Sequence, residues 1–124
     1  MSRILIVEDT RLMRDSLVDV LGAAGHTVAT ADNGADAVEM VAAGAAFDLI
    51  VTDIIMPEMD GIQAIIEIQS LQPEARIVAI SGGSARLEKA QGLETARRLG
   101  AIAVLEKPFE VDTLLAAIEA ALKS

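Results

Sequence analysis

Residues 49–61 read LIVTDIIMPEMDG, and this stretch decides the fold expected for the chain. It begins with an unbroken apolar run, which is typical of a parallel strand covered on both faces. The run ends on a carboxylate, Asp53, after which Met56-Pro57 and Asp60-Gly61 indicate a turn and the start of a helix. In an open α/β sheet, ligand sites lie beyond the carboxyl ends of the strands, so Asp53 is a candidate site residue.

The same pattern of apolar runs recurs along the whole chain. The runs are ILIV (4–7), TVATA (27–31), FDLIVT (47–52), RIVAI (76–80) and AIAVL (101–105). Segments with helical periodicity lie between and after them, at 17–24, 34–43, 62–71, 85–99 and 111–122. The helix at 85–99 has a weaker apolar stripe and an internal glycine, so it is expected to be the least stable. Five alternations of strand and helix predict an α/β fold with right-handed crossovers.

Length and composition predict one domain, spanning residues 1–124, without a separate output domain. Apolar residues form 52% of the chain but only two are aromatic, so the core is expected to be aliphatic. The absence of cysteine excludes disulfides, thiolate nucleophiles and cysteine-based zinc sites. No apolar stretch is long enough for a spanning helix or a signal peptide, which favours a cytoplasmic protein without membrane insertion.

Charge narrows the range of partners. The formal charge of -9 repels nucleic acid phosphates, and the chain has no Trp or Tyr for base stacking. Direct nucleic acid binding is therefore not expected. A protein partner or a cation suits this charge better.

Polar residues follow four of the apolar runs: Glu8-Asp9, Asp53, Ser81 and Lys107. If the first and third strands are neighbours, three carboxylates converge on one pocket. Such charges repel one another unless some are protonated or a cation joins them. Oxygen ligands without His or Cys favour a hard ion, and Mg²⁺ fits well.

A carboxylate beside a cation at a strand end can attack phosphorus and become an acyl phosphate. Asp53 is the predicted nucleophile, and Lys107 and the Ser81 hydroxyl would contact the new phosphoryl oxygens. Simpler interpretations remain for single residues. Asp9 or Thr10 could cap the first helix, and His26, which follows Gly25, is expected to be a surface turn residue and not a ligand.

Four motifs together resemble the receiver domain of two-component response regulators. They are ILIVEDT (4–10), DLIVTDIIMPEMDG (48–61), VAISGG (78–83) and LEKPF (105–109). The resemblance covers the whole chain, and the motifs occur in the family's order. It implies a flavodoxin-like, doubly wound sheet of five parallel strands in the order 2-1-3-4-5, with five helices.

The resemblance also implies roles for individual residues. Asp53 would be the phosphoacceptor, Ser81 the switch hydroxyl and Lys107 the partner of the phosphoryl group. The implied Mg²⁺ ligands are Glu8, Asp9, Asp53 and the backbone carbonyl of Ile55. The donor would be the phosphohistidine of a histidine kinase or histidine phosphotransfer protein.

A downstream protein target would bind the face formed by the fourth helix, fifth strand and fifth helix, whose conformation shifts on phosphorylation. Basic residues on the fourth helix interrupt the acidic surface there: Arg86, Lys89, Arg97 and Arg98. One position departs from the family pattern. Many members carry an aromatic residue three positions before the lysine, where this chain has Val104, so the usual hydroxyl–aromatic coupling does not carry over.

Two alternative functions differ in class from a phosphoacceptor switch. A Mg²⁺-dependent phosphohydrolase would need a second acid close after its nucleophile, and Ile55 occupies the position two residues after Asp53. A phosphorylation-independent interaction module would keep the fold but need none of the strand-end residues. Partner affinity that is unchanged by Asp53→Asn and by a phosphodonor would favour that module.

We predict slow self-dephosphorylation, because the side chains of Ile55 and Gly83 cannot orient a water by hydrogen bonding. In the family, residues at these positions influence how water reaches the acyl phosphate. The lifetime of the phosphorylated protein after removal of the donor checks this. A lifetime of seconds, and not hours, would contradict it.

Overall fold

The computed structural model describes residues 2–54, 61–81, 100–106 and 109–123. The strands are β1 (Arg3–Val7), β2 (Thr27–Ala31), β3 (Leu49–Asp53), β4 (Ile77–Ser81) and β5 (Ala103–Glu106). The helices are α1 (Arg11–Ala23), α2 (Gly34–Ala42), α3 (Gly61–Leu71) and α5 (Val111–Leu122). These elements confirm the predicted alternation, while the helix expected at 85–99 lies outside the described residues.

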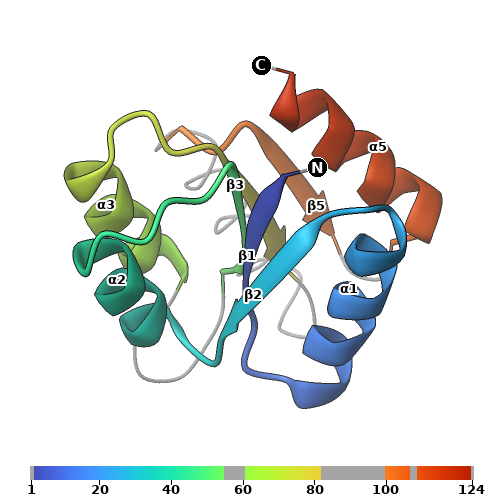
Figure 1. The fold of residues 1–124 in the computed structure, drawn as a ribbon, viewed down its shortest axis with the longest axis horizontal. Helices are drawn as coiled ribbons and strands as arrows, with labels where there is room; N and C mark the ends of the chain where they lie inside the picture. Colours follow the sequence, from blue (N-terminus) through green and yellow to red (C-terminus); the bar gives the residue numbers. More distant parts are fainter. Residues whose placement is uncertain (1, 55–60, 82–99, 107–108, 124) are drawn as a thin grey trace.

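All five strands form one parallel sheet in the order β2-β1-β3-β4-β5 (Figure 1). This is the doubly wound, flavodoxin-like order that the family resemblance implied. The chain reverses direction across the sheet between β2 and β3, so that β1 lies between them. Such a reversal is the topological switch point where α/β sheets bind ligands.

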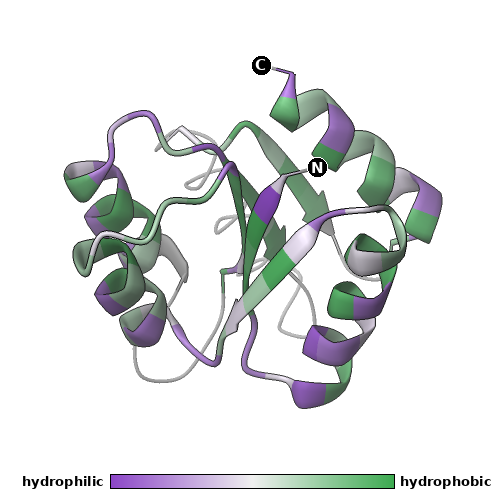
Figure 2. Cartoon of the chain, in the orientation of Figure 1, coloured by the Kyte–Doolittle hydropathy of each residue, from purple (hydrophilic) through white to green (hydrophobic). Residues whose placement is uncertain are grey.

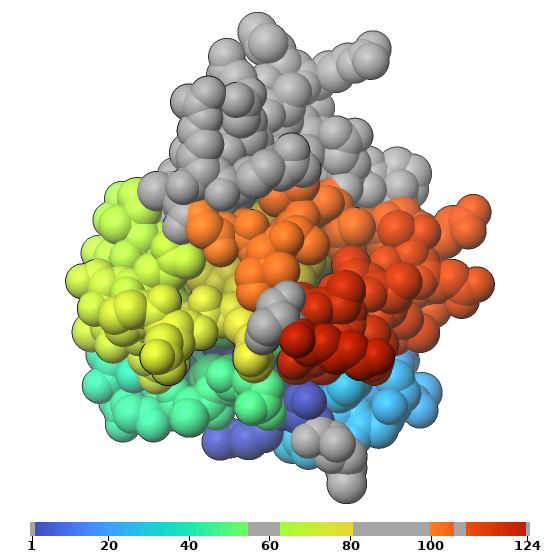
Figure 3. Space-filling view, turned by 90° about the horizontal axis from the view of Figure 1, so that it is seen from above, coloured from blue at the N-terminus to red at the C-terminus, as the bar shows by residue number. Residues whose placement is uncertain are grey.

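Alternating side chains of the strands divide the core into two halves. Leu5 and Val7 of β1 pack with α2 and α3, whereas Ile4 and Ile6 pack with α1 and α5. The two helix pairs accordingly cover opposite faces of the sheet (Figures 1 and 3). Figure 2 shows hydrophobic colour concentrated in the sheet and on the sheet-facing sides of the helices. Burial on both faces explains why most strands lack polar alternation.

Two strands, β3 and β5, begin two residues later than their apolar runs. Phe47 precedes β3, and the Arg3 guanidinium lies 5.3 Å from the centroid of its ring. Asp48 accepts a hydrogen bond at 2.7 Å from the Arg3 backbone N–H through its side chain. The fifth run starts at Ala101, but β5 starts at Ala103. Apolar composition alone does not mark where ladder pairing starts.

The prediction for His26 was wrong in one respect. The residue does follow a turn, at Gly25 with φ of 96°, but its side chain is only 7% exposed. Its Nε2 lies 3.8 Å from Oε1 of Glu119 on α5. Local sequence carries no signal of this long-range contact with α5.

None of the helices in the described part of the chain combines the length and the apolar character needed to cross a lipid bilayer.

We expect Ile118→Ala to lower the free energy of unfolding by about 2–5 kcal/mol, because its side chain is fully buried under the sheet. Ile66→Ala is the matched control, since Ile66 lies on α3 with 44% exposure and should cost about 1 kcal/mol or less. Urea unfolding curves measure both changes. Equal losses for the two variants would contradict this description of the core.

Candidate functional site

The register of β1 and β3 creates the site. Val7 lies opposite Thr52 in this parallel pair, so the chain delivers Glu8 and Asp53 side by side at the carboxyl edge of the sheet. Asp53 is the last residue of β3, and Asp9 follows Glu8 in the loop before α1. Glu8 and Asp53, which are far apart in the sequence, therefore meet at the switch point of the sheet.

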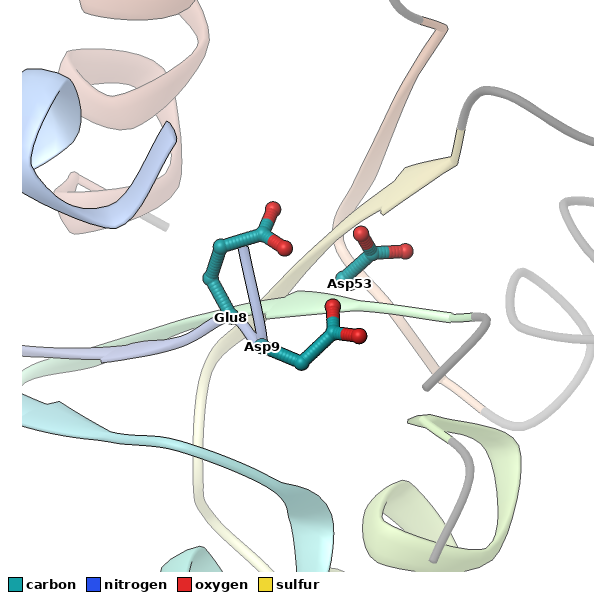
Figure 4. A group of neighbouring side chains, drawn as sticks. All are labelled: Glu8, Asp9 and Asp53. Carbon is teal, nitrogen blue, oxygen red and sulfur yellow. The ribbon is translucent and has the colours of Figure 1, made fainter. Parts of the chain in front are cut away.

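Three carboxylates gather at this edge (Figure 4). One carboxylate oxygen from each of Glu8, Asp9 and Asp53 lies within 4.8 Å of the others. Glu8 and Asp53 are 1% and 5% exposed, whereas Asp9 is exposed to solvent. The predicted convergence of these three residues is confirmed.

Short hydrogen bonds hold the backbone around the carboxylates. The Thr10 backbone N–H donates to Oε2 of Glu8 at 3.1 Å, and the buried Thr52 hydroxyl donates to the Asp53 carbonyl oxygen at 3.0 Å. The Ile54 N–H donates to the Ile80 carbonyl at 2.8 Å and so continues the ladder past Asp53. Thr10 occupies the N-cap position of α1, but its side chain makes no capping hydrogen bond. Its backbone amide binds Glu8 instead.

Electrostatics favour a cation at this cluster. At an effective dielectric near 20, two unit charges about 4 Å apart interact by about 4 kcal/mol, so three neighbouring carboxylates repel strongly when all are ionised. A bound cation would reverse the sign of this energy. The donors are all carboxylate oxygens, two of them buried, which suits a hard ion such as Mg²⁺ and not a soft metal.

The remaining predicted residues are only partly described. Ser81 is the last residue of β4 and lies opposite Glu106, the last residue of β5, at the same edge of the sheet. Lys107 follows Glu106 directly in the sequence, but Lys107 and Ile55 lie outside the described residues. The backbone of Ser81 is thus placed beside the carboxylate cluster, because its neighbour Ile80 pairs with Asp53.

Sequence reasoning missed Arg14. Its Nη1 donates to the backbone carbonyl oxygen of Glu8 at 3.1 Å and lies 3.1 Å from Oδ1 of Asp32. Arginine on an amphipathic helix usually points to solvent, and this side chain is only 17% exposed. The one available signal was its place in the second turn after the acidic pair.

Comparisons with known proteins agree with the fold and identify the family. The family model described as the response regulator receiver domain matches residues 4–119. The chain is 41% identical over 117 residues to the chemotaxis protein CheY of Bacillus subtilis (strain 168), covering 94% of this chain and 93% of that protein. It is 34% identical over 121 residues to the DNA-binding transcriptional regulator NtrC of Azospirillum brasilense, covering 98% of this chain but 24% of that protein.

A solved structure gives the same result. The N-terminal domain of a response regulator/sensory box/GGDEF 3-domain protein from Carboxydothermus hydrogenoformans superimposes with a TM-score of 0.85 at 31% sequence identity. The superposition covers 98% of this chain and 94% of that one.

We predict that Asp53→Asn raises the free energy of unfolding by about 1 kcal/mol or more in the absence of divalent cations, because it removes one of three crowded charges. Asp19→Asn is the control, since Asp19 is exposed on α1 outside the cluster. Urea unfolding in EDTA measures the difference, which added salt should reduce. Equal effects of the two substitutions would contradict crowding of the carboxylates.

Proposed function

This chain belongs to the family of response regulator receiver domains, whose members are signalling switches, and on that premise we propose that it accepts a phosphoryl group on Asp53. The observation that carries the proposal is the position of Asp53, buried at the end of β3 with a carboxylate oxygen within 4.8 Å of those of Glu8 and Asp9. The donor is the phosphohistidine of a histidine kinase or histidine phosphotransfer protein.

The proposed cofactor is Mg²⁺, held by Glu8, Asp9, Asp53 and the backbone carbonyl of Ile55. The donor set supports it, because the described part of this set consists of carboxylate oxygens at the right separation for one ion. When bound, the ion would neutralise charge on the phosphoryl oxygens and on the carboxylates that face them.

Asp53 acts as the nucleophile. A carboxylate oxygen forms a bond to phosphorus while the P–N bond of the phosphohistidine breaks, and the electron pair of that bond returns to the imidazole ring. The hydrogen bond from Thr52 to the Asp53 carbonyl oxygen, together with the continued ladder at Ile54, holds the nucleophile's backbone during the reaction. The domain thereby catalyses its own phosphorylation and, slowly, the loss of the phosphoryl group.

The switch follows from contacts that exist only in the phosphorylated state. Ser81 and Lys107 bind the phosphoryl oxygens, and a conformation with better contacts to them gains population. Val104 lies in β5 opposite Ala79 and packs against the core on the α2 and α3 side. The switch therefore works without an aromatic side chain at this position.

The output of the switch is proposed to be control of a downstream protein in the cytoplasm, bound at the face of the 85–99 segment, β5 and α5. The net charge of -9 favours a protein over direct contact with nucleic acid. Residues 1–124 are proposed to form a single receiver domain. Regulation of transcription, as the name of NtrC indicates for that protein, would require parts beyond this chain.

Intact-mass spectrometry tests the phosphoacceptor. After incubation with Mg²⁺ and a small acyl or amido phosphate, the protein should gain the mass of one phosphoryl group. Asp53→Asn should gain none, because an amide nitrogen is not a competent nucleophile, and Asp36→Asn on α2 should gain as much as the unsubstituted chain. EDTA should abolish the gain.

A folded, Mg²⁺-binding protein without any mass gain would overturn the proposal and favour the phosphorylation-independent interaction module. Sustained turnover of small phosphoesters at catalytic rates would instead favour the phosphohydrolase.

A further inference from the structure

Arg14 connects three elements at the acidic edge of the sheet. It lies on α1, and its Nη1 contacts the Glu8 carbonyl oxygen, just past β1, and the Asp32 carboxylate, just past β2, each at 3.1 Å. The Arg14 side chain is 17% exposed and that of Asp32 is 70% exposed. Most of the Arg14 side chain is therefore covered by the protein, while its acidic partner faces solvent.

The contact to the Glu8 carbonyl bears on the metal-binding carboxylates through the peptide plane. The carbonyl of Glu8 and the N–H of Asp9 belong to one rigid peptide group. A guanidinium that binds this carbonyl fixes the orientation of the peptide, and with it the directions in which the side chains of Glu8 and Asp9 leave the backbone. Two of the three clustered carboxylates depend on this peptide.

Other hydrogen bonds also fix the backbone and the side chain of Glu8. Its N–H donates to the Ala31 carbonyl at 3.1 Å and extends the β1–β2 ladder, and its Oε2 accepts from the Thr10 N–H at 3.1 Å. With the Arg14 contact, the backbone donor, backbone acceptor and carboxylate of Glu8 are each held by a neighbouring element. At metal sites, residues that hydrogen-bond to the metal ligands orient those ligands in this way.

By its charge alone, Arg14 would lower the affinity of the acidic cluster for Mg²⁺. A cation near the cluster disfavours a second cation, although the Asp32 carboxylate at 3.1 Å offsets much of that charge. Removal of Arg14 should therefore strengthen Mg²⁺ binding if the residue acts by charge, and weaken it if the residue acts by orientation. The two roles predict opposite signs.

We propose that Arg14, anchored by Asp32, is a positioning residue that orients the Glu8–Asp9 peptide and thereby raises the affinity of the acidic site for a divalent cation. This inference rests on the proposed function, because it assigns the ion to the same cluster. It adds a residue from α1 and one from the β2–α2 connection to the machinery of the site.

Calorimetric titration with Mg²⁺ tests the inference. Arg14→Met removes both contacts and should weaken binding by about 10-fold or more. Arg14→Lys keeps the charge but lacks the planar fork, so it should restore part of the affinity. Arg11→Met is the matched control, because it removes the same charge from an 86% exposed side chain of the same helix, and binding should change by less than about two-fold.

Asp32→Ala tests the anchor. It should weaken Mg²⁺ binding, and the double variant Arg14→Met with Asp32→Ala should bind no more weakly than Arg14→Met, because Asp32 acts on the site only by holding Arg14. Unfolding curves for each variant separate these effects from a general loss of stability. Unchanged or tighter binding by Arg14→Met would overturn the inference.

Amide hydrogen exchange in the metal-free protein gives a readout that does not depend on the ion. Arg14→Met should speed exchange at the Thr10 and Glu8 amides, but not at Asp36, whose amide is held by the Asn33 side chain at 2.8 Å. If the unsubstituted protein bound no Mg²⁺, the proposed function would fail. Unaltered exchange at Thr10 and Glu8 would then overturn the positioning role as well, and faster exchange would support it.

Discussion

Parallel pairing between β1 and β3 is the constraint on which the rest of the structure depends. The register that sets Val7 opposite Thr52 puts Glu8 next to Asp53 without any direct attraction between them. Their side chains repel, so the apolar core on both faces of the sheet must hold them together. Each strand contributes side chains to both halves of that core.

Burial of the carboxylates lowers the stability of the fold, and it also prepares the cluster for the proposed binding of a cation and a phosphoryl group. A carboxylate with 1% or 5% exposure has lost most of its water, which is costly for a charged group. Local conflicts of this kind mark functional sites in natural proteins, because the surrounding fold offsets their cost. Thr52 is buried beside the cluster as well, and its hydroxyl donates to the Asp53 carbonyl oxygen.

The sequence predicted all five strands and the four described helices because apolar runs and helical stripes are local signals. It placed the start of two strands two residues too early, since Phe47 and Ala101 are apolar but precede the ladder. It also placed His26 on the surface. The side chain is 7% exposed and lies beside Glu119 on α5, far along the chain, and no local pattern reports such a contact.

By itself the sequence determined the α/β class and the identity of the candidate acids, because both follow from residue types at the ends of apolar runs. Only the tertiary structure decided that Glu8, Asp9 and Asp53 share one site and that Arg14 reaches across to Glu8 and Asp32. The physical reason is distance along the chain. Strand order, register and the burial of a charged side chain arise from packing between remote segments, and a linear pattern of residues does not contain those separations.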